Sequence, residues 1–264
     1  MKKIVLILCA VLALSACELI PDNEQIIEVF TPADTSQIKR ASLLIEYSGW
    51  RCMNCPKAAE VAHGLKEQYG EELVVVVMHP ASNPNTRFGS NQAVNYTCPE
   101  ADSMYIHMGG TNTTPFPTGN VNFMQQDNAY FANSDTWAGS SSIIMNQAVE
   151  CEDKDLTVEV YLCNMGSNNQ NATLQIWLTE DGVVGKQFMP DGNTNSEYVH
   201  NHLLRSSVLP SIWGETIQMP SITPQTFHFT YTLPDKVVAE NCHVVSVLSI
   251  DGVVVQAKET IITK

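Results

Sequence analysis

Apolar and polar residues follow different patterns in the two halves of the chain. In the first half, residues 42–47 (SLLIEY) and 71–79 (EELVVVVMH) are apolar runs, typical of strands buried on both faces of a partly parallel sheet. Between them, residues 56–69 repeat apolar side chains at helical spacing, and Gly70 follows as a helix stop. The pattern predicts a strand, a helix and a second strand.

The rest of the first half predicts a second helix, a hairpin and a closing helix. After a polar stretch at 80–97, a helix begins at Thr97, where TCPE has the spacing of a capping box, and ends at the glycine pair 109–110. Residues 114–133 predict a proline-marked strand with a hairpin partner, and residues 135–150 predict the closing helix. We therefore expect one α/β domain of about 110 residues.

Beyond residue 150 the pattern changes to short alternating runs, which predict half-buried β-strands. The tripeptides EDG (180–182) and IDG (250–252) mark tight hairpins between such runs, and no stretch of this half has helical spacing. We expect an all-β, Ig-like sandwich of about seven strands. The predicted fold class is therefore α+β, with an α/β domain followed by a β-sandwich domain.

The first residues predict a signal peptide. Lys2 and Lys3 precede an apolar segment, residues 4–14, that is too short for a comfortable membrane span. The sequence LSAC (14–17) matches the bacterial lipobox, which implies cleavage before Cys17 and lipid on its thiol and amine. An ordinary secretory signal is the alternative.

These features divide the chain into four segments and give it a location. We expect a signal peptide, a lipidated tether, an α/β domain and a β-sandwich domain, at residues 1–16, 17–40, 41–150 and 151–264. Acylation at the N-terminal cysteine would attach the mature protein stably to a membrane. The expected location is the cell envelope, at the periplasmic or surface face of the outer membrane.

The charge balance and the cysteine content limit the partners. The chain has 14 Lys+Arg against 28 Asp+Glu, a formal net charge of -14. Such a surface repels phosphate backbones, so nucleic acid is not an expected partner. Disulfides persist in the envelope, and the expected partners there are protein thiols and disulfides. Nothing in the sequence indicates a cofactor.

Two cysteines three positions apart stand between the first strand and the first helix. In GWRCMNCPK (49–57), Cys52 would lie at the exposed N-terminus of the helix, where free N–H groups and the helix dipole stabilise a thiolate. Cys55 would lie one turn further in and resolve a mixed disulfide. A structural disulfide with no client is the alternative for this pair.

Metal binding is the less favoured use of these residues. A zinc site would need two further ligands beside Cys52 and Cys55, and no second C-x-x-C exists. His200 and His202 could place two imidazoles on one face of a strand, but a third ligand is not evident. We expect no metal site.

With these residues in place, the chain resembles the thioredoxin fold. Besides GWRCMNCPK, it carries Glu46 six residues before Cys52, and FPT (116–118) in front of the strand GNVNF. The resemblance implies that the first domain is thioredoxin-like. It also implies that Glu46 accepts the proton of Cys55, and that Pro117 is a cis-proline packed against the dithiol.

The chain is also similar to the outer membrane protein 28-related lipoproteins. The motifs GWRCMNCP, PTGNVNF and HNHLLRSSVLP (200–210) carry this likeness, which covers most of the mature chain. In that family a lipidated thioredoxin-like domain precedes a β domain. The resemblance therefore supports both the anchor and the order of the two domains.

Two functional hypotheses follow. The first is a membrane-anchored thiol–disulfide oxidoreductase that acts on protein disulfides, with Cys52 as nucleophile, Cys55 as resolver, Glu46 as proton acceptor and Pro117 as substrate-loop residue. The second is a non-catalytic outer-membrane lipoprotein with a structural C-x-x-C disulfide, whose β domain binds a protein or glycan partner. A reduction potential far below the glutathione range would indicate the second.

Four further cysteines are candidates for disulfides, and they allow three pairings. We favour Cys163–Cys242, which would join two strands of the β domain. That leaves Cys98–Cys151, which would tie the second helix to the junction between the domains.

Overall fold

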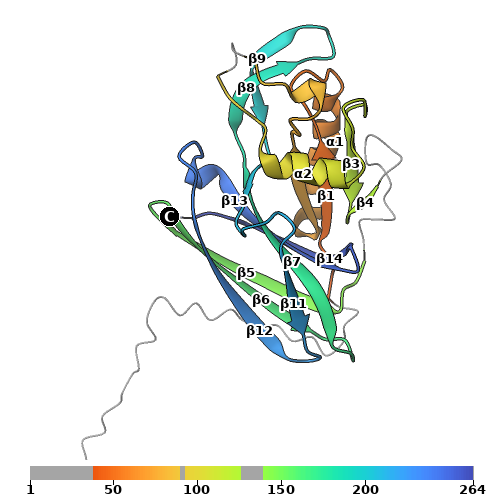
Figure 1. Cartoon of the computed structure of the whole chain (residues 1–264), viewed down its shortest axis with the longest axis vertical. Coiled ribbons are helices and arrows are strands. Elements are labelled where there is room, and N and C mark those ends of the chain that lie inside the picture. Colours follow the sequence, from red (N-terminus) through yellow and green to blue (C-terminus); the bar gives the residue numbers. More distant parts are fainter. Residues whose placement is uncertain (1–37, 90–92, 126–138, 264) are drawn as a thin grey trace, which may run out of the picture. The chain divides into compact units, whose positions relative to one another are not determined.

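The computed structural model describes residues 38–89, 93–125 and 139–263 (Figure 1). The predicted signal peptide, the lipidation site Cys17 and most of the hairpin partner predicted within 114–133 lie outside the described residues. None of the helices in the described ranges is long and apolar enough to cross a membrane.

The first half has the predicted order of strands and helices as far as β4. Its elements are β1 (Ser42–Tyr47), α1 (Cys55–Tyr69), η2 (Gly70–Glu72), β2 (Leu73–Met78), η3 (Pro84–Thr86), α2 (Pro99–His107), β3 (Thr118–Val121) and β4 (Met124–Gln125), where η denotes a one-turn 3-10 helix. Strands β1 and β2 are parallel, and β3 runs antiparallel to β1. All six residues of β1 are buried, as in a central strand that is covered on both faces.

The second half consists of strands, as predicted. They are β5 (Ile143–Glu152), β6 (Asp155–Asn164), β7 (Gln170–Glu180), β8 (Val183–Phe188), β9 (Thr194–His200), β10 (Leu203–Ser207), β11 (Glu215–Met219), β12 (Pro224–Thr232), β13 (Cys242–Ile250) and β14 (Val253–Ile261), with the one-turn helix η5 (Ala239–Asn241) before β13. The α+β class is therefore confirmed. Of the two predicted hairpins, IDG (250–252) is present, because it joins the paired strands β13 and β14, and Gly252 has a positive φ. The hairpin predicted at EDG (180–182) was wrong, because β8 pairs with β9 and not with β7.

One sheet runs through both halves. Nine strands form a mixed sheet in the order β14-β13-β7-β10-β2-β1-β3-β4, and β11 also pairs with β7. The connection between the halves is a parallel contact of β10 with β2, where Leu203 lies opposite Val77. The Val77 N–H also donates to the His202 carbonyl at 2.8 Å. The second half thus extends the sheet of the first.

Two smaller sheets complete the fold. The three-stranded sheet β12-β6-β5 packs one face against β7 and β13, and a single apolar cluster fills the space between these layers. The two-stranded hairpin β8–β9 extends away from the large sheet towards the end of the structure that contains α1 (Figure 1). This hairpin carries residues of the candidate site.

The closing helix predicted at 135–150 was wrong. The described part of this stretch forms β5, which pairs with β6 along its whole length. Ile143, Met145 and Val149 are buried in the cluster between the two layers, so the apolar side chains follow the period of two of a strand. The β-branched residues of this segment are better accommodated in a pleated sheet than in a helix.

Candidate functional site

The C-x-x-C pair forms a disulfide at the start of α1. Helix α1 begins at Cys55, and Pro56 follows in the first turn, where its missing N–H costs no hydrogen bond. Cys52 lies in the preceding loop, and its N–H donates to the Gly49 carbonyl at 2.9 Å. The disulfide therefore lies where the free N–H groups of the helix N-terminus favour negative charge on sulfur.

The loop before the disulfide packs closely on the segment that contains η3. The Arg51 N–H donates to the Asn85 carbonyl at 3.0 Å. A Cβ atom on Gly49 would lie 2.6 Å from the same carbonyl oxygen, so only glycine allows this approach. Trp50 closes the loop by donating from its indole N–H to the Arg87 carbonyl at 3.0 Å.

Pro117 directly precedes β3, and Glu46 lies on the neighbouring strand β1. The Phe116–Pro117 bond is cis, the conformation that the thioredoxin resemblance implies. Phe116 belongs to the same buried cluster as Cys52 and Cys55. Glu46 lies on β1 opposite Gly119 of β3, the second residue after Pro117. Strand pairing thus brings together groups that are about 70 residues apart in sequence.

Glu46 is fully buried, and neither of its carboxyl oxygens has a hydrogen-bond partner among the described residues. Burial raises the pKa of Glu46 to about 7. The polar side chain of Ser48 lowers the pKa of Glu46 and so offsets part of this rise. A carboxyl group with this pKa exchanges protons near neutral pH, as a general acid or base requires.

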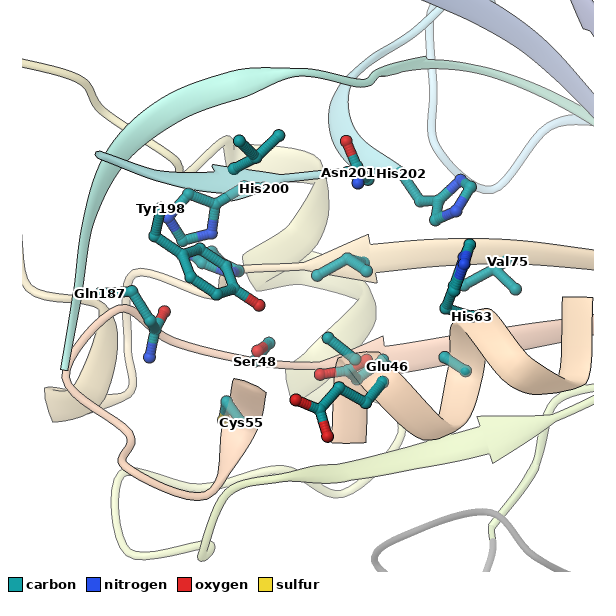
Figure 2. A pocket seen from close by; sticks show the side chains of 16 residues that line it. Glu46, Ser48, Cys55, His63, Val75, Gln187, Tyr198, His200, Asn201 and His202 are labelled. Carbon is teal, nitrogen blue, oxygen red and sulfur yellow. The ribbon is translucent and has the colours of Figure 1, made fainter. Parts of the chain in front are cut away.

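A pocket of about 220 Å³ opens beside Cys55 (Figure 2). The groups that argue for chemistry there are Glu46, Ser48, Cys55, His79, Tyr198 and His200. The carboxyl group of Glu46 and the ring of Tyr198 both project into this space. Cys55 and the buried acid Glu46 therefore line the same cavity.

The β8–β9 hairpin covers the disulfide loop, which the sequence did not indicate. Phe188 donates its N–H to the Trp50 carbonyl at 2.7 Å, and Gln187 donates from Nε2 to the Cys52 carbonyl at 2.9 Å. As a result Cys52 is only 6% exposed and Cys55 only 2%. The expectation of an exposed Cys52 was wrong, because a hairpin from the second half packs on this loop.

Four rings lie together on the hairpin side of the pocket. His200 stacks on Tyr96 at 4.4 Å between ring centroids, and it contacts His79 at 5.7 Å and Tyr198 at 4.8 Å. Burial lowers the pKa of His200 to about 4 and that of His79 well below its ordinary value. Both imidazoles are therefore neutral at physiological pH, and they form an uncharged wall beside Glu46.

His202 does not join His200 in a metal pair. Its backbone has a φ of 56°, which turns its ring towards Asp181, 3.5 Å away, whereas His200 Nε2 faces the Lys186 carbonyl at 3.3 Å. Across the described ranges, no group of three or more histidines, cysteines and carboxylates is arranged to hold a metal ion.

Comparison with known proteins gives the family. The family model described as Outer membrane protein Omp28 matches residues 105–264, which is more than half of the chain. The chain belongs to the Omp28 family. The match begins after the C-x-x-C loop and includes β3, the β8–β9 hairpin and the whole strand-rich half. None of the curated proteins compared with this Omp28-family chain matches its sequence.

Two solved structures align with most of this chain and share its fold. HBP35 of Porphyromonas gingivalis aligns with a TM-score of 0.64 at 14% identity, over 86% of this chain and 76% of that one. AGR_C_4864 from Agrobacterium tumefaciens aligns with a TM-score of 0.50 at 13% identity, over 84% and 94%. A domain of the outer membrane lipoprotein Omp28 from P. gingivalis is 22% identical over 47% of this chain and 89% of its own, with a TM-score of 0.34.

The other cysteines of this Omp28-family chain do not form the favoured disulfides. Cys98 lies at the start of α2 in the buried cluster that contains the dithiol, whereas Cys151 packs against the cluster between the two layers. Cys163 lies opposite Ile144, at the end of β5 away from Cys151. None of the four cysteines is in a disulfide in the structure, Cys151 and Cys242 included, and sequence alone does not give the distances between strands that decide such a pairing.

The buried Glu46 gives the Omp28-family chain a specific pH dependence. The folded state holds this proton up to about pH 7, whereas the unfolded chain loses it near the ordinary value of 4.5. The carboxyl group should therefore reduce stability progressively from pH 4.5 to 7 and by a constant amount above pH 7. Each pKa unit corresponds to about 1.4 kcal/mol, so the total should be roughly 3 kcal/mol.

We expect Glu46→Gln to remove this pH-dependent part. The difference in unfolding free energy between variant and wild type, measured by urea denaturation at about pH 4 and about pH 8, should shift by roughly 3 kcal/mol in favour of the variant. Glu60→Gln, which removes an exposed carboxyl group from the rim of the same pocket, is the control. An equal difference at both pH values for Glu46→Gln would contradict the raised pKa of this carboxyl group.

Proposed function

We propose that this Omp28-family protein is a membrane-anchored thiol–disulfide oxidoreductase of the cell envelope. The observation that carries the proposal is the Cys52–Cys55 disulfide at a helix N-terminus, in a chain that also has a cis-proline before β3 and a buried acid in the pocket beside Cys55. The parallel β1–β2 pair, the antiparallel β3 and the helix after the dithiol support a thioredoxin-like reading of the first half. The two strand layers of the second half support a sandwich-like reading.

The reaction would use both sulfurs and the acid. The Cys52 thiolate attacks a client disulfide, one client sulfur leaves as a thiol, and a mixed disulfide forms. Cys55 then gives its proton to Glu46 and attacks the Cys52 sulfur, which releases the second client thiol. The dithiol is oxidised and the client is reduced by two electrons. The pocket beside Cys55 would let the Glu46 proton reach solvent.

The second candidate is a scaffold with a structural disulfide. The near-complete burial of both sulfurs favours it, because a client must reach Cys52 to react. In that reading the second half would bind a protein or glycan partner at the outer membrane. The family and one of the solved relatives are both named for the outer membrane, which agrees with either candidate.

Trapping separates the two candidates. In the oxidoreductase, Cys55→Ala should accumulate mixed disulfides with envelope proteins through Cys52, because the resolving thiol is gone. Cys52→Ala should trap few, since Cys55 is the more deeply buried sulfur. Non-reducing gels of envelope extracts would show the adducts, with the double variant as control. If neither variant forms adducts and the wild type neither reduces nor oxidises a model disulfide, the scaffold candidate is the better one.

The contact between Gln187 and the Cys52 carbonyl should control access to the disulfide. Gln187→Ala leaves a buried carbonyl without its donor, which costs about 1–3 kcal/mol and loosens the hairpin. The rate at which dithiothreitol reduces Cys52–Cys55 should therefore rise several-fold. Gln218→Ala, at an exposed position on β11, is the control and should leave the rate unchanged. An unchanged rate for Gln187→Ala would mean that the hairpin does not limit access.

The anchor is tested by lipidation. Wild-type protein should incorporate a labelled fatty acid, and Cys17→Ser should lose the label and be released from the membrane fraction or fail to mature, because the lipobox cysteine is the acylated residue. Unlabelled wild-type protein would instead indicate an ordinary secretory signal.

A further inference from the structure

Strand β5 crosses β13 with a specific contact. The Gln147 side chain donates from Nε2 to the Val244 carbonyl at 3.0 Å, and the Ser246 hydroxyl donates to Gln147 Oε1. One glutamine thus joins the three-stranded sheet to the nine-stranded sheet near the middle of β5. These contacts show that Gln147 of β5 lies opposite Val244 to Ser246 of β13.

The order of contacts along β5 gives the relative direction of the strands. At its start, the Gln256 side chain donates to the Ile143 carbonyl at 3.1 Å. Gln256 of β14 is paired with Leu248 of β13. Moving along β5 from Ile143 to Gln147 therefore corresponds to moving back along β13 from Leu248 to about Val245. The two strands run in opposite directions across the interface.

Continuing by four residues on each strand brings two cysteines together. Cys151 follows Gln147 by four positions and Cys242 precedes Ser246 by four, so each cysteine points to the same face as the residue that makes the contact. Both steps span about 13 Å, at about 3.3 Å per residue, in the same direction along the interface. Cys151 packs against the apolar cluster that contains Cys242.

We propose that Cys151 and Cys242 form a second disulfide, which joins the three-stranded sheet to the nine-stranded sheet. The electrostatics agree with this geometry. Burial is the main cause that raises the pKa of the Cys242 thiol to about 12, and Cys151 is close enough to add to the rise. Cys151 is the more exposed of the two and would react first.

The bond forms by ordinary thiol–disulfide exchange. The Cys151 thiolate attacks a low-molecular-weight disulfide, one thiol of the oxidant leaves, and a mixed disulfide results. Cys242 then attacks the Cys151 sulfur and releases the second thiol. The two cysteines lose two electrons and two protons. The oxidant takes up these electrons and protons and becomes two thiols.

The position of the bond connects it to the hairpin that covers the dithiol. Cys242 pairs with Glu180 at the end of β7, and the neighbouring Asn241 accepts a hydrogen bond from the Asp181 N–H at 2.8 Å. Asp181 begins the turn that leads into β8. A disulfide at Cys242 would therefore steady the base of the β8–β9 hairpin.

Peptide mapping of the wild-type chain tests the proposal. The mature protein, equilibrated with oxidised glutathione and denatured without reductant, should have two alkylatable thiols, Cys98 and Cys163, and a cross-linked peptide pair that contains Cys151 and Cys242. Four alkylatable thiols, or a cross-link through Cys98 or Cys163, would overturn it. The mapping does not depend on any variant folding.

Matched variants test its effect on stability. Cys151→Ser should lower the melting temperature of the oxidised protein by several degrees and leave it unchanged in reductant, because the lost bond constrains the unfolded chain. Cys163→Ser retains the proposed cross-link and is the control. Its melting temperature should fall on reduction by as much as that of the wild type. An equal loss for Cys151→Ser with and without reductant would assign the effect to packing and would contradict the disulfide.

Discussion

The arrangement of this protein depends on the short parallel contact between β2 and β10. Only Leu203 and Val77 are in register, and the Val77 N–H to His202 carbonyl bond completes the contact. Through it the strands of the second half continue the sheet that contains the dithiol. Because β10 follows directly after β9, the same contact holds the β8–β9 hairpin over the start of α1. This pairing and the direct contacts of Phe188 and Gln187 with the loop around Cys52 together position the hairpin.

Covering the dithiol has two opposite effects. The backbone contact from Phe188 and the Gln187 amide stabilise the loop around Cys52, and they exclude water from the sulfurs. The same contacts limit the approach of a client. The cover is nevertheless a two-stranded hairpin that pairs only with itself, and hairpins of this kind are marginally stable alone. The contacts with the loop around Cys52 and with Tyr96 therefore hold the hairpin in place, and access to the dithiol depends on them.

The features that sequence predicted well are local ones. The strands β1 and β2, helix α1 and the helix-start position of the dithiol follow from apolar patterns and from residues such as Pro56 and Gly70. The errors involve contacts between distant segments. Gln187 stands in a run that reads only as a strand, and nothing around it indicates that its amide reaches the Cys52 carbonyl 135 residues away.

The helix predicted at 135–150 failed for a related reason. Its alternating residues Ile143, Met145 and Val149 have a strand period, but the preceding small and polar residues resemble a helix start, and only pairing with β6 decides between the two. The cysteine pairings could not be derived from the sequence, because the distance between strands of two different sheets is set by how the sheets pack. Sequence spacing carries no information on such a distance.

The state of Glu46 bears on the choice between the two candidate functions. A structural disulfide needs only apolar cover, and an apolar side chain at this position would fill the space beside Cys55 without desolvating a carboxyl group. Instead the chain places there an acid with no hydrogen-bond partner among the described residues, and the ionised form is destabilised by burial. A buried group that lowers stability at neutral pH is expected where proton transfer is needed. Glu46 lines the same pocket as Cys55, the sulfur whose proton would leave in the proposed resolving step. The buried acid therefore favours the oxidoreductase over the scaffold.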